Sequence, residues 1–366
     1  RRPPPPEAVQ SMSDINFHTT GRAGIITLTR PKALNALSMT MVNDMGEALD
    51  GWAEDDGVER VVVTHEGKAF CAGGDIRDVY ERREAAVDFF IAEYTNNHRV
   101  KRFPKPYISL IDGICMGGGV GISVHGSHRV GGENLVFAMP EVGIGLFPDV
   151  GASYVLSRMA GEFGLYLGLT GHRLTRGGAA AAGIITHPVA SASIPDALDR
   201  AAHAEDLDAA LAELAVATEP LDRGELAAIE EAFSAGSVSE ILTRLKAADD
   251  PFSAKAAAAI EGKSPTSLAV TFREIRGALD RPFEACLRDE FRILCQILKG
   301  HDFYEGIRAV VIDKDNAPKW NPASLSAVDE AAIKAHFQEP EGGDLTLPPG
   351  GETSLSVHHR LSDTLP

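Results

Sequence analysis

The feature that most restricts the fold of this chain is an alternation of short β-prone runs, glycine-containing turns and helical segments. Residues 24–29 form a β-prone run, and residues 39–52 then space their apolar positions as a helix does. Residues 58–64 repeat the β-prone pattern before the turn 72–75, and residues 107–119 start like a strand and end in a glycine cluster. Strands that alternate with helices predict an α/β fold with layered elements.

The length and the change of composition along the chain predict more than one structural segment. At 366 residues the chain exceeds the size at which a single core usually stops growing. Residues 194–248 are rich in Ala, Glu and Leu, whereas the residues beyond 337 are rich in Gly, Pro and Ser. We therefore expect a proline-rich lead at 1–13, an α/β core at 14–200, a helical region at 201–338 and a flexible tail at 339–366.

Charge and apolar patterning exclude several classes of function. The formal net charge of -17 opposes nonspecific binding to nucleic acid or to an anionic membrane. No apolar run approaches the roughly 20 residues that cross a bilayer, so we expect no membrane partner. Two leading arginines could be a trace of a transit peptide, but Glu7 and Asp14 follow early, and such peptides avoid acids. We expect a cytoplasmic protein, with the mitochondrial matrix left open.

The cysteines and histidines do not form a recognisable metal or nucleophile motif. The four cysteines are scattered and form no CxxC pair, which favours reduced thiols over a disulfide framework or a zinc site: Cys71, Cys115, Cys286 and Cys295. His125 and His128 stand three apart, without an HExxH pattern or a third ligand at metal spacing. We therefore expect no metal site and no covalent serine or cysteine mechanism.

Two glycine clusters follow strand candidates, and both could place backbone amides beside a ligand. Glycine lets the backbone approach a ligand because no side chain intervenes, and the clusters are Gly73-Gly74 and residues 117–119. If one amide from each loop pointed at the same oxygen, the pair would form an oxyanion hole. The alternative is that both clusters are only tight turns.

Several long segments resemble, in order and in spacing, the crotonase (enoyl-CoA hydratase/isomerase) superfamily. The segments of the core stand at 26–37, 68–76, 105–121, 137–161 and 169–187. Within the superfamily the fit is closest to the 3-hydroxyisobutyryl-CoA hydrolase family, whose C-terminal signature is similar to SPTSL at 264–268 and GHDFYEGIRAVVIDKDNAPKW at 300–320. The resemblance implies a ClpP/crotonase fold of repeated ββα units with a helical C-terminal domain, and chemistry on a CoA thioester.

The resemblance also implies roles for residues of the two glycine loops. Gly74 and Gly118 would donate the two amides of the oxyanion hole. Five further residues fall where the family binds its substrate, largely along the CoA groove: Lys32, Ala33, Ala72, Asp75 and Ile76. For Lys32 a plain surface lysine is an equally good interpretation. Coenzyme A would enter as part of the acyl-CoA substrate, and no separate cofactor is expected.

Two carboxylates at 141 and 149 are the candidates for acid and base work. Glu141 matches a catalytic glutamate of the family in FAMPE, and Asp149 lies eight residues later in LFPDVG. Two carboxylates near one thioester could divide nucleophile or base work from acid work, because repulsion and burial separate their pKa values. The alternatives are a solvated glutamate and, for Asp149, an N-cap of the helix that starts near Ala152. A hydratase of the family typically has glycine in place of Asp149.

Two further positions separate hydrolysis from hydration. Hydratases resemble GGGxE where this chain reads GGGVG, so Gly121 replaces a glutamate, and water addition needs two groups to hold and deprotonate the water. Glu93 matches a family position that contacts the acyl group and could accept a hydrogen bond from a 3-hydroxyl. Its alternative is an exposed helical glutamate.

Together these residues predict hydrolysis of a short 3-hydroxyacyl-CoA, with Glu141 as nucleophile or as general base. The resemblance implies 3-hydroxyisobutyryl-CoA, with 3-hydroxypropionyl-CoA as a second substrate, in valine breakdown. The rivals are an enoyl-CoA hydratase or isomerase and a non-catalytic acyl-CoA-binding protein. Relatives in the family are often trimers or multiples of trimers, so a homo-oligomer is possible as well.

Overall fold

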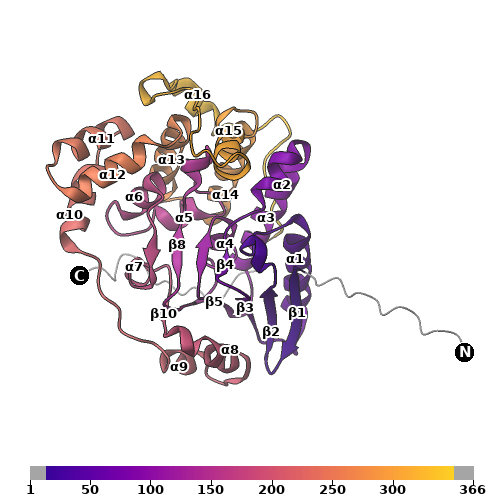
Figure 1. Ribbon diagram of the computed structural model, residues 1–366. Helices are drawn as coiled ribbons and strands as arrows, with labels where there is room; N and C mark the ends of the chain where they lie inside the picture. The colour runs from indigo at the N-terminus through magenta and orange to yellow at the C-terminus, as the bar shows by residue number, and fades with distance from the viewer. Residues whose placement is uncertain (1–13, 350–366) are drawn as a thin grey trace, which may run out of the picture.

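Two sheets form the centre of the molecule in a computed structural model that describes residues 14–349 (Figure 1). The first sheet has the strand order β1-β2-β3-β5-β7-β10, in which only the β1–β2 pair is antiparallel. Its strands are β1 (Ile15–Thr20), β2 (Ala23–Leu28), β3 (Arg60–His65), β5 (Tyr107–Ile111), β7 (His128–Gly131) and β10 (His187–Pro188). The parallel strands β2, β3 and β5 are almost wholly buried, as expected for strands covered on both faces.

The second sheet is shorter and runs in the order β4-β6-β8-β9. Its strands are β4 (Ala69–Cys71), β6 (Ile114–Met116), β8 (Val136–Ala138) and β9 (Leu174–Thr175). The chain visits the sheets in turn, since β3, β5 and β7 each lead to the next strand of the second sheet. This gives the repeated ββα pattern, and the predicted α/β, crotonase-like fold class is confirmed.

Helices follow the strands of the second sheet and pack around both sheets. The helices and 3-10 turns of the core are η1 (Pro31–Ala33), α1 (Met39–Glu54), α2 (Ile76–Glu81), η2 (Arg83–Ala85), α3 (Ala86–Lys101), α4 (Gly118–Gly121), η3 (Glu141–Ile144), α5 (Ala152–Leu156), α6 (Phe163–Thr170) and α7 (Arg176–Ala181). The helix predicted at 39–52 is α1, which Ser38 caps by accepting a hydrogen bond from the Met41 amide.

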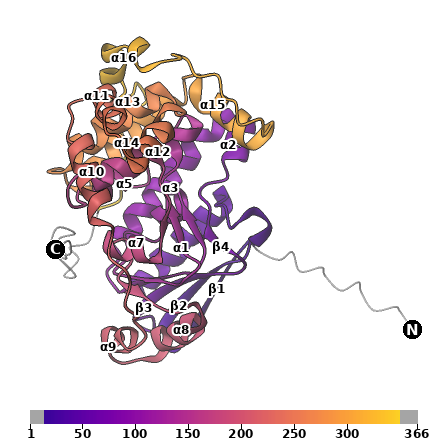
Figure 2. The ribbon, with the colours of Figure 1, turned by 60° about the vertical axis from the view of Figure 1, so that its left-hand side comes forward.

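Two short helices cover the first sheet at the end of the molecule opposite the other C-terminal helices (Figure 2). They are α8 (Ile194–His203), which follows η4 (Ser191–Ser193), and α9 (Leu207–Ala212). Their alanines and leucines pack against β2, β3, β5 and β7 in a separate apolar cluster. The division predicted at 200/201 therefore falls inside α8. The composition changes at about residue 194, whereas α8 and α9 still pack on the first sheet.

The remaining helices form a second cover over α5, α6 and η3 (Figures 1 and 2). They are α10 (Arg223–Phe233), α11 (Val238–Ala247), α12 (Pro251–Glu261), α13 (Pro265–Ala278), α14 (Phe283–Ile297), α15 (Asp302–Ile307), the π-helical η5 (Arg308–Ile312), η6 (Leu325–Ala327) and α16 (Glu330–Ala335). Aspartate or serine side chains cap the first turns of α10 to α13. One continuous apolar cluster joins this cover to the core.

The segment 339–349 lies against the body of the protein, so the tail predicted at 339–366 is wrong for its first part. Asp344 forms a salt bridge with Arg292 of α14, and Leu345 is buried in the main core. The rest of the tail and the lead predicted at 1–13 lie outside the described residues. None of the described helices has the length and apolar character that a bilayer crossing requires.

Candidate active site

The two glycine loops leave the same edge of the second sheet and touch each other. Strands β4 and β6 are parallel and pair Cys71 with Cys115, so the residues that follow each strand start side by side. A Cβ atom on Gly118 would lie 3.2 Å from the Gly74 nitrogen, and one on Gly117 would lie 3.3 Å from the Gly73 Cα atom. The structure therefore brings the two loops together, as a shared ligand would require.

Both candidate amides are unused by the backbone within residues 14–349. The Leu37–Gly74 bridge uses the Gly73 oxygen and the Asp75 nitrogen, which leaves the Gly74 amide without a backbone acceptor. Gly118 is the first residue of α4, a position whose N–H has no intrahelical partner. Both N–H groups are therefore without a backbone acceptor among these residues.

Glu141 stands at the end of the third strand in the same row. Strand β8 pairs with β6, and η3 begins at Glu141 three residues after the end of β8. The side chain is 5% exposed, and its Oε1 atom would lie 3.2 Å from a Cβ atom on Gly117. No described residue hydrogen-bonds its Oε2 atom. Burial, and then the charges of Asp149 and Glu93, raise the pKa of Glu141 well above its ordinary value.

Glu93 reaches the glycine loops from helix α3. It is 2% exposed, so the alternative of an exposed helical glutamate is wrong. A Cβ atom on Gly118 would lie 2.3 Å from the Glu93 Oε1 atom, which has no hydrogen-bond partner among the described residues. Burial and the charge of Asp149 raise the pKa of Glu93 well above its ordinary value. The position is compatible with a contact to bound substrate.

Asp149 is the third buried acid, and it is held by a tyrosine that the sequence analysis missed. The side chain is 3% exposed, and the Tyr94 hydroxyl donates a hydrogen bond of 2.8 Å to its Oδ2 atom. Burial raises the pKa of Asp149 to about 7, although the hydrogen bond from Tyr94 opposes the rise. The alternative of an N-cap is wrong, because the N-cap residue of α5 is Gly151 and not Asp149.

The place of the absent second glutamate is filled by an asparagine. A Cβ atom on Gly121 would lie 2.5 Å from the Asn97 Nδ2 atom and 2.8 Å from the Val150 Cβ atom. Asn97 is fully buried one turn after Glu93 on α3, and neither of its side-chain polar atoms has a partner among the described residues. A side chain at 121 would therefore displace Asn97. Only the folded structure brings these two positions together.

The residues predicted for the CoA groove flank the Gly73–Gly74 loop. Lys32 and Ala33 lie in η1, and the chain that follows pairs with the segment 72–75 through the Ala72 amide and the Leu34 oxygen, 3.0 Å apart. Ile76 opens α2 directly after the loop. The Asp75 carboxylate is engaged within the protein, because it accepts from the Asp78 amide and pairs with Arg30 at 2.8 Å. Whether Asp75 contacts the substrate stays a prediction.

Asn35 is a further residue that the sequence analysis missed, and it fixes the loop before the groove. Leu34 and Asn35 both have positive φ angles, a backbone conformation that residues other than glycine adopt at a cost in free energy. The Asn35 side chain donates to the carbonyl oxygens of Glu66 and Ala69 and accepts from the Arg30 amide. Asparagine tolerates this conformation better than most residues, so the residue type was a signal that could have been read.

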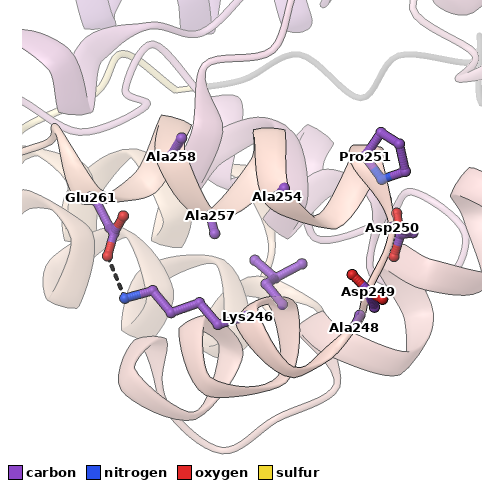
Figure 3. Close-up of a pocket in the computed structure, with 10 residues that line it drawn as sticks. Lys246, Ala248, Asp249, Asp250, Pro251, Ala254, Ala257, Ala258 and Glu261 are labelled. Atoms are coloured by element: carbon purple, nitrogen blue, oxygen red, sulfur yellow. Dashed lines mark ion pairs between the residues drawn. The ribbon is translucent and has the colours of Figure 1, made fainter.

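A surface depression, two histidines and the four cysteines lie outside the set of predicted site residues. A surface depression between α11 and α12 is lined by none of the predicted site residues (Figure 3). His125 binds the Val150 carbonyl oxygen, and His128 lies between Ser127 and Asp208. No group of three or more His, Cys, Asp or Glu side chains within residues 14–349 is arranged to hold a metal ion. The four cysteines are free thiols.

Comparisons with known proteins agree with this geometry. The profile of the enoyl-CoA hydratase/isomerase family matches residues 23–337. The chain is 42% identical over 351 residues to a mitochondrial 3-hydroxyisobutyryl-CoA hydrolase of Danio rerio, with 92% of each chain covered. The corresponding human protein is 41% identical over 348 residues, covering 91% of this chain and 90% of that protein.

Two solved structures share the fold at substantial sequence identity. A carnitinyl-CoA dehydratase from Mycobacterium thermoresistibile is 40% identical with a TM-score of 0.86, and the match covers 91% of this chain and 98% of that one. An enoyl-CoA hydratase from Rhodobacter sphaeroides is 38% identical with a TM-score of 0.83, and the match covers 92% of this chain and all of that one. The chain therefore belongs to the enoyl-CoA hydratase/isomerase family.

Proposed function

We propose that this protein hydrolyses the thioester of a short 3-hydroxyacyl-CoA to the free acid and coenzyme A. The first substrate would be 3-hydroxyisobutyryl-CoA, in valine breakdown, and 3-hydroxypropionyl-CoA the second. The names of the relatives from Danio rerio and human support this choice, since each alignment covers about nine tenths of both chains. The observation that carries the proposal is a set of buried carboxyls beside two unused glycine amides.

The two amides would stabilise the oxygen of the thioester. When the carbonyl carbon is attacked, negative charge collects on that oxygen, and the Gly74 and Gly118 N–H groups would bind it. Their proximity supports this role, because a Cβ atom on Gly118 would already lie 3.2 Å from the Gly74 nitrogen. In a buried site such donors need no reorganisation during the reaction.

The carboxyls would divide the remaining work. Glu141 either attacks the carbonyl carbon and forms a mixed anhydride, which water then hydrolyses, or it removes a proton from an attacking water. In both routes the C–S bond breaks, the sulfur leaves with a proton as the thiol of coenzyme A, and one water is consumed. Burial and repulsion between the acids raise the pKa of all three, to about 7 for Asp149, so Asp149 can exchange a proton near neutral pH.

Glu93 would select the substrate by its 3-hydroxyl group. Its free oxygen faces the Gly118 backbone, where the acyl group of a thioester bound to the two amides would lie. A substrate without the hydroxyl would leave a buried carboxyl unpaired, which costs about 1–3 kcal/mol. An acyl-CoA that lacks the 3-hydroxyl should therefore be a poorer substrate.

Hydration of an enoyl-CoA is the second candidate, because the two solved relatives carry hydratase and dehydratase names. In that reaction Glu93 would supply the second carboxylate that Gly121 does not. The contact between Gly121 and Asn97 argues against this candidate, since it leaves no room for a side chain at the position where hydratases of the family hold their water.

One experiment separates hydrolysis, hydration and simple binding. The purified protein is incubated with 3-hydroxyisobutyryl-CoA and with crotonyl-CoA, while free thiol and the enoyl absorbance are followed. We expect thiol release from the first compound and little enoyl loss from the second. Enoyl loss without thiol release would overturn the hydrolase proposal, and silence in both assays would favour a binding protein.

A Glu141→Gln variant tests which carboxyl carries the chemistry. The amide can neither attack the carbonyl carbon nor accept a proton, so kcat should fall on the order of 10,000-fold. The fold should be retained, because glutamine has nearly the same size as glutamate and carries no titratable group. Circular dichroism and a melting curve provide the control for folding. A variant that kept wild-type kcat would remove Glu141 from the mechanism.

The compartment and the assembly complete the proposal. Four free thiols support a reducing compartment, either the cytoplasm or the mitochondrial matrix, and the mitochondrial names of the relatives favour the matrix. The partner proposed is the acyl-CoA substrate, with no nucleic acid and no separate cofactor. A homo-oligomer, trimeric or a multiple of trimers, is part of the proposal and is tested by light scattering.

A further inference from the structure

The turn that follows Asp149 has an unusual backbone that other parts of the protein must hold in place. Val150 and Gly151 both have positive φ angles, of 57° and 81°. A β-branched residue such as valine is a genuine outlier in the left-handed region, and the conformation costs on the order of 1–3 kcal/mol. The turn persists only if surrounding contacts compensate for this cost.

Two buried side chains form hydrogen bonds with the backbone of this turn. The His125 Nε2 atom lies 2.7 Å from the Val150 carbonyl oxygen, and burial lowers the pKa of His125 to about 3, so the neutral ring donates there. Glu290 accepts a hydrogen bond from the Gly151 amide at 2.7 Å. Glu290 also accepts from the Ser153 amide at 3.1 Å and from the Ser153 hydroxyl at 2.5 Å.

Glu290 belongs to helix α14 of the second helical cover, 139 residues beyond Gly151 in the sequence. It is fully buried, and the three groups that hydrogen-bond it within the described residues all act as donors. A carboxylate can accept all three bonds, and these bonds oppose the burial that raises the pKa of Glu290 to about 8. A glutamine would turn its NH₂ group toward at least one of these donors and lose that bond.

The Asp149 side chain is therefore fixed at two points. Tyr94 holds the carboxyl itself, and the backbone at 150 and 151 determines from which direction that carboxyl enters the site. We propose that Glu290 is a positioning residue for Asp149, which fixes the left-handed turn and thereby the place of the Asp149 carboxyl beside Glu141. The inference rests on the proposed hydrolysis, because that reaction is what gives Asp149 its task. It makes the C-terminal helical cover part of the catalytic apparatus.

A Glu290→Gln variant tests this role against a matched control. We expect kcat to fall on the order of 100-fold, because small displacements of a catalytic group have effects of that size, while KM stays close to wild type. The control is Asp289→Asn, the adjacent carboxyl of the same helix, which pairs with Arg281 at 3.0 Å and does not touch the turn. Asp289→Asn should keep kcat. Equal kcat values in Glu290→Gln and wild type would overturn the proposal.

Combination with Asp149→Asn separates positioning from a general loss of structure. If Glu290 acts through Asp149, then Glu290→Gln should lower kcat no further once the Asp149 carboxyl is gone. A loss that persists at full size in the Asp149→Asn background would show a merely structural role and overturn the proposal. Should Glu290→Gln fail to fold, Ser153→Ala removes one of the three donors and should give a smaller loss with the same non-additivity.

A crystal structure of Glu290→Gln provides a readout that does not depend on the substrate. We expect residues 149–153 to change conformation while the glycine loops stay in place. An unchanged turn would overturn the positioning role whatever the protein does to acyl-CoA. If the wild-type protein releases no thiol from 3-hydroxyisobutyryl-CoA, the proposed function fails, and the structure still decides how Asp149 is held.

Discussion

Two helical covers pack on this α/β core, and they bury different kinds of side chains. Helices α8 and α9 cover the first sheet with apolar residues alone, namely Ala197, Ala201, Ala202, Leu207 and Leu211. Helices α13 and α14 also bury hydroxyls and carboxyls, namely Ser267, Thr271, Glu274 and Glu290. The two covers lie at opposite ends of the molecule (Figure 2).

The difference separates a cover that stabilises the fold from one that also serves the site. Burial of apolar surface gains about 25 cal/mol per Å², whereas a buried carboxyl without partners costs free energy or takes up a proton. Neither Glu274 oxygen has a partner among the described residues, and burial, with the charge of Glu290, raises the pKa of Glu274 well above its ordinary value. We therefore expect substitutions in the α8–α9 cover to change stability alone, and substitutions beside the buried acids to change activity.

The largest effect is expected at the glycine loops, which lie in the core beside the buried acid Glu93. Gly118→Ala would put a methyl group 2.3 Å from the Glu93 Oε1 atom and 3.2 Å from the Gly74 nitrogen. It would therefore displace Glu93 and crowd the amide that should bind the thioester oxygen. We expect kcat to fall on the order of 1,000-fold, the size of losing an oxyanion donor.

The control for Gly118→Ala is another glycine in a helix. A Cβ atom on Gly277 of α13 would meet no atom within 4 Å, so Gly277→Ala should leave kcat unchanged and raise stability slightly. Steady-state kinetics of both variants, with melting curves, make the test. An active Gly118→Ala protein would mean that the thioester oxygen binds elsewhere.

The next effect is expected on the apolar side and in stability alone. Leu211 of α9 is fully buried against the first sheet, far from the acids. Leu211→Ala should lower the free energy of unfolding by about 3 kcal/mol, through lost burial and a cavity, and leave kcat per folded molecule unchanged. Urea titration and kinetics measure the two quantities separately. A large fall in kcat at full folding would mean that α8 and α9 also support the site.

The sequence predicted the parts of the site that lie close to strand ends. Gly74, Gly118 and Glu141 follow β4, β6 and β8 by a few residues, and parallel strands bring their ends together without further information. A glycine pair after a strand is a local signal. The roles predicted for these residues came from the resemblance to a family.

The parts that could not be predicted depend on contacts between distant segments. Tyr94 and Asp149 are 55 residues apart, and Gly151 and Glu290 are 139 apart. Nothing in the residues around Glu290 distinguishes it from an exposed glutamate on an amphipathic helix. The packing of α8 and α9 on the first sheet was missed for a related reason. Their alanine-rich composition resembles that of the helices that follow, and composition does not show which element a helix packs against.

A third prediction uses pH to measure what the burial of Asp149 costs the folded state. Burial raises the folded pKa of Asp149 from 3.8 to about 7, so the folded state binds more protons than the unfolded chain between these values. Stability should therefore fall as pH rises through that window. Asp149→Asn removes this contribution and should stabilise the protein at pH 8 on the order of 2 kcal/mol, and less at pH 5.

Melting curves of wild type and Asp149→Asn at both pH values make this test, with Leu211→Ala as the control. Leu211→Ala introduces no change in charge, so its difference from wild type should be the same at pH 5 and pH 8. If the stability difference between Asp149→Asn and wild type were the same at both pH values, burial would not raise the pKa of Asp149 as proposed.

The smallest effect concerns the hydrogen bond that tunes Asp149. The Tyr94 hydroxyl stabilises the Asp149 carboxylate and so holds its pKa below the value that burial alone would give. Tyr94→Phe should therefore move the corresponding inflection of the pH profile of kcat/KM upward, by about one unit for a hydrogen bond to a charged group. Tyr107→Phe is the matched control, because that buried hydroxyl donates to the Ile122 carbonyl oxygen and touches no acid. It should cost stability without moving the inflection. A downward shift in Tyr94→Phe would mean that Tyr94 favours the protonated form, and the division of acid and base work would then have to be reversed.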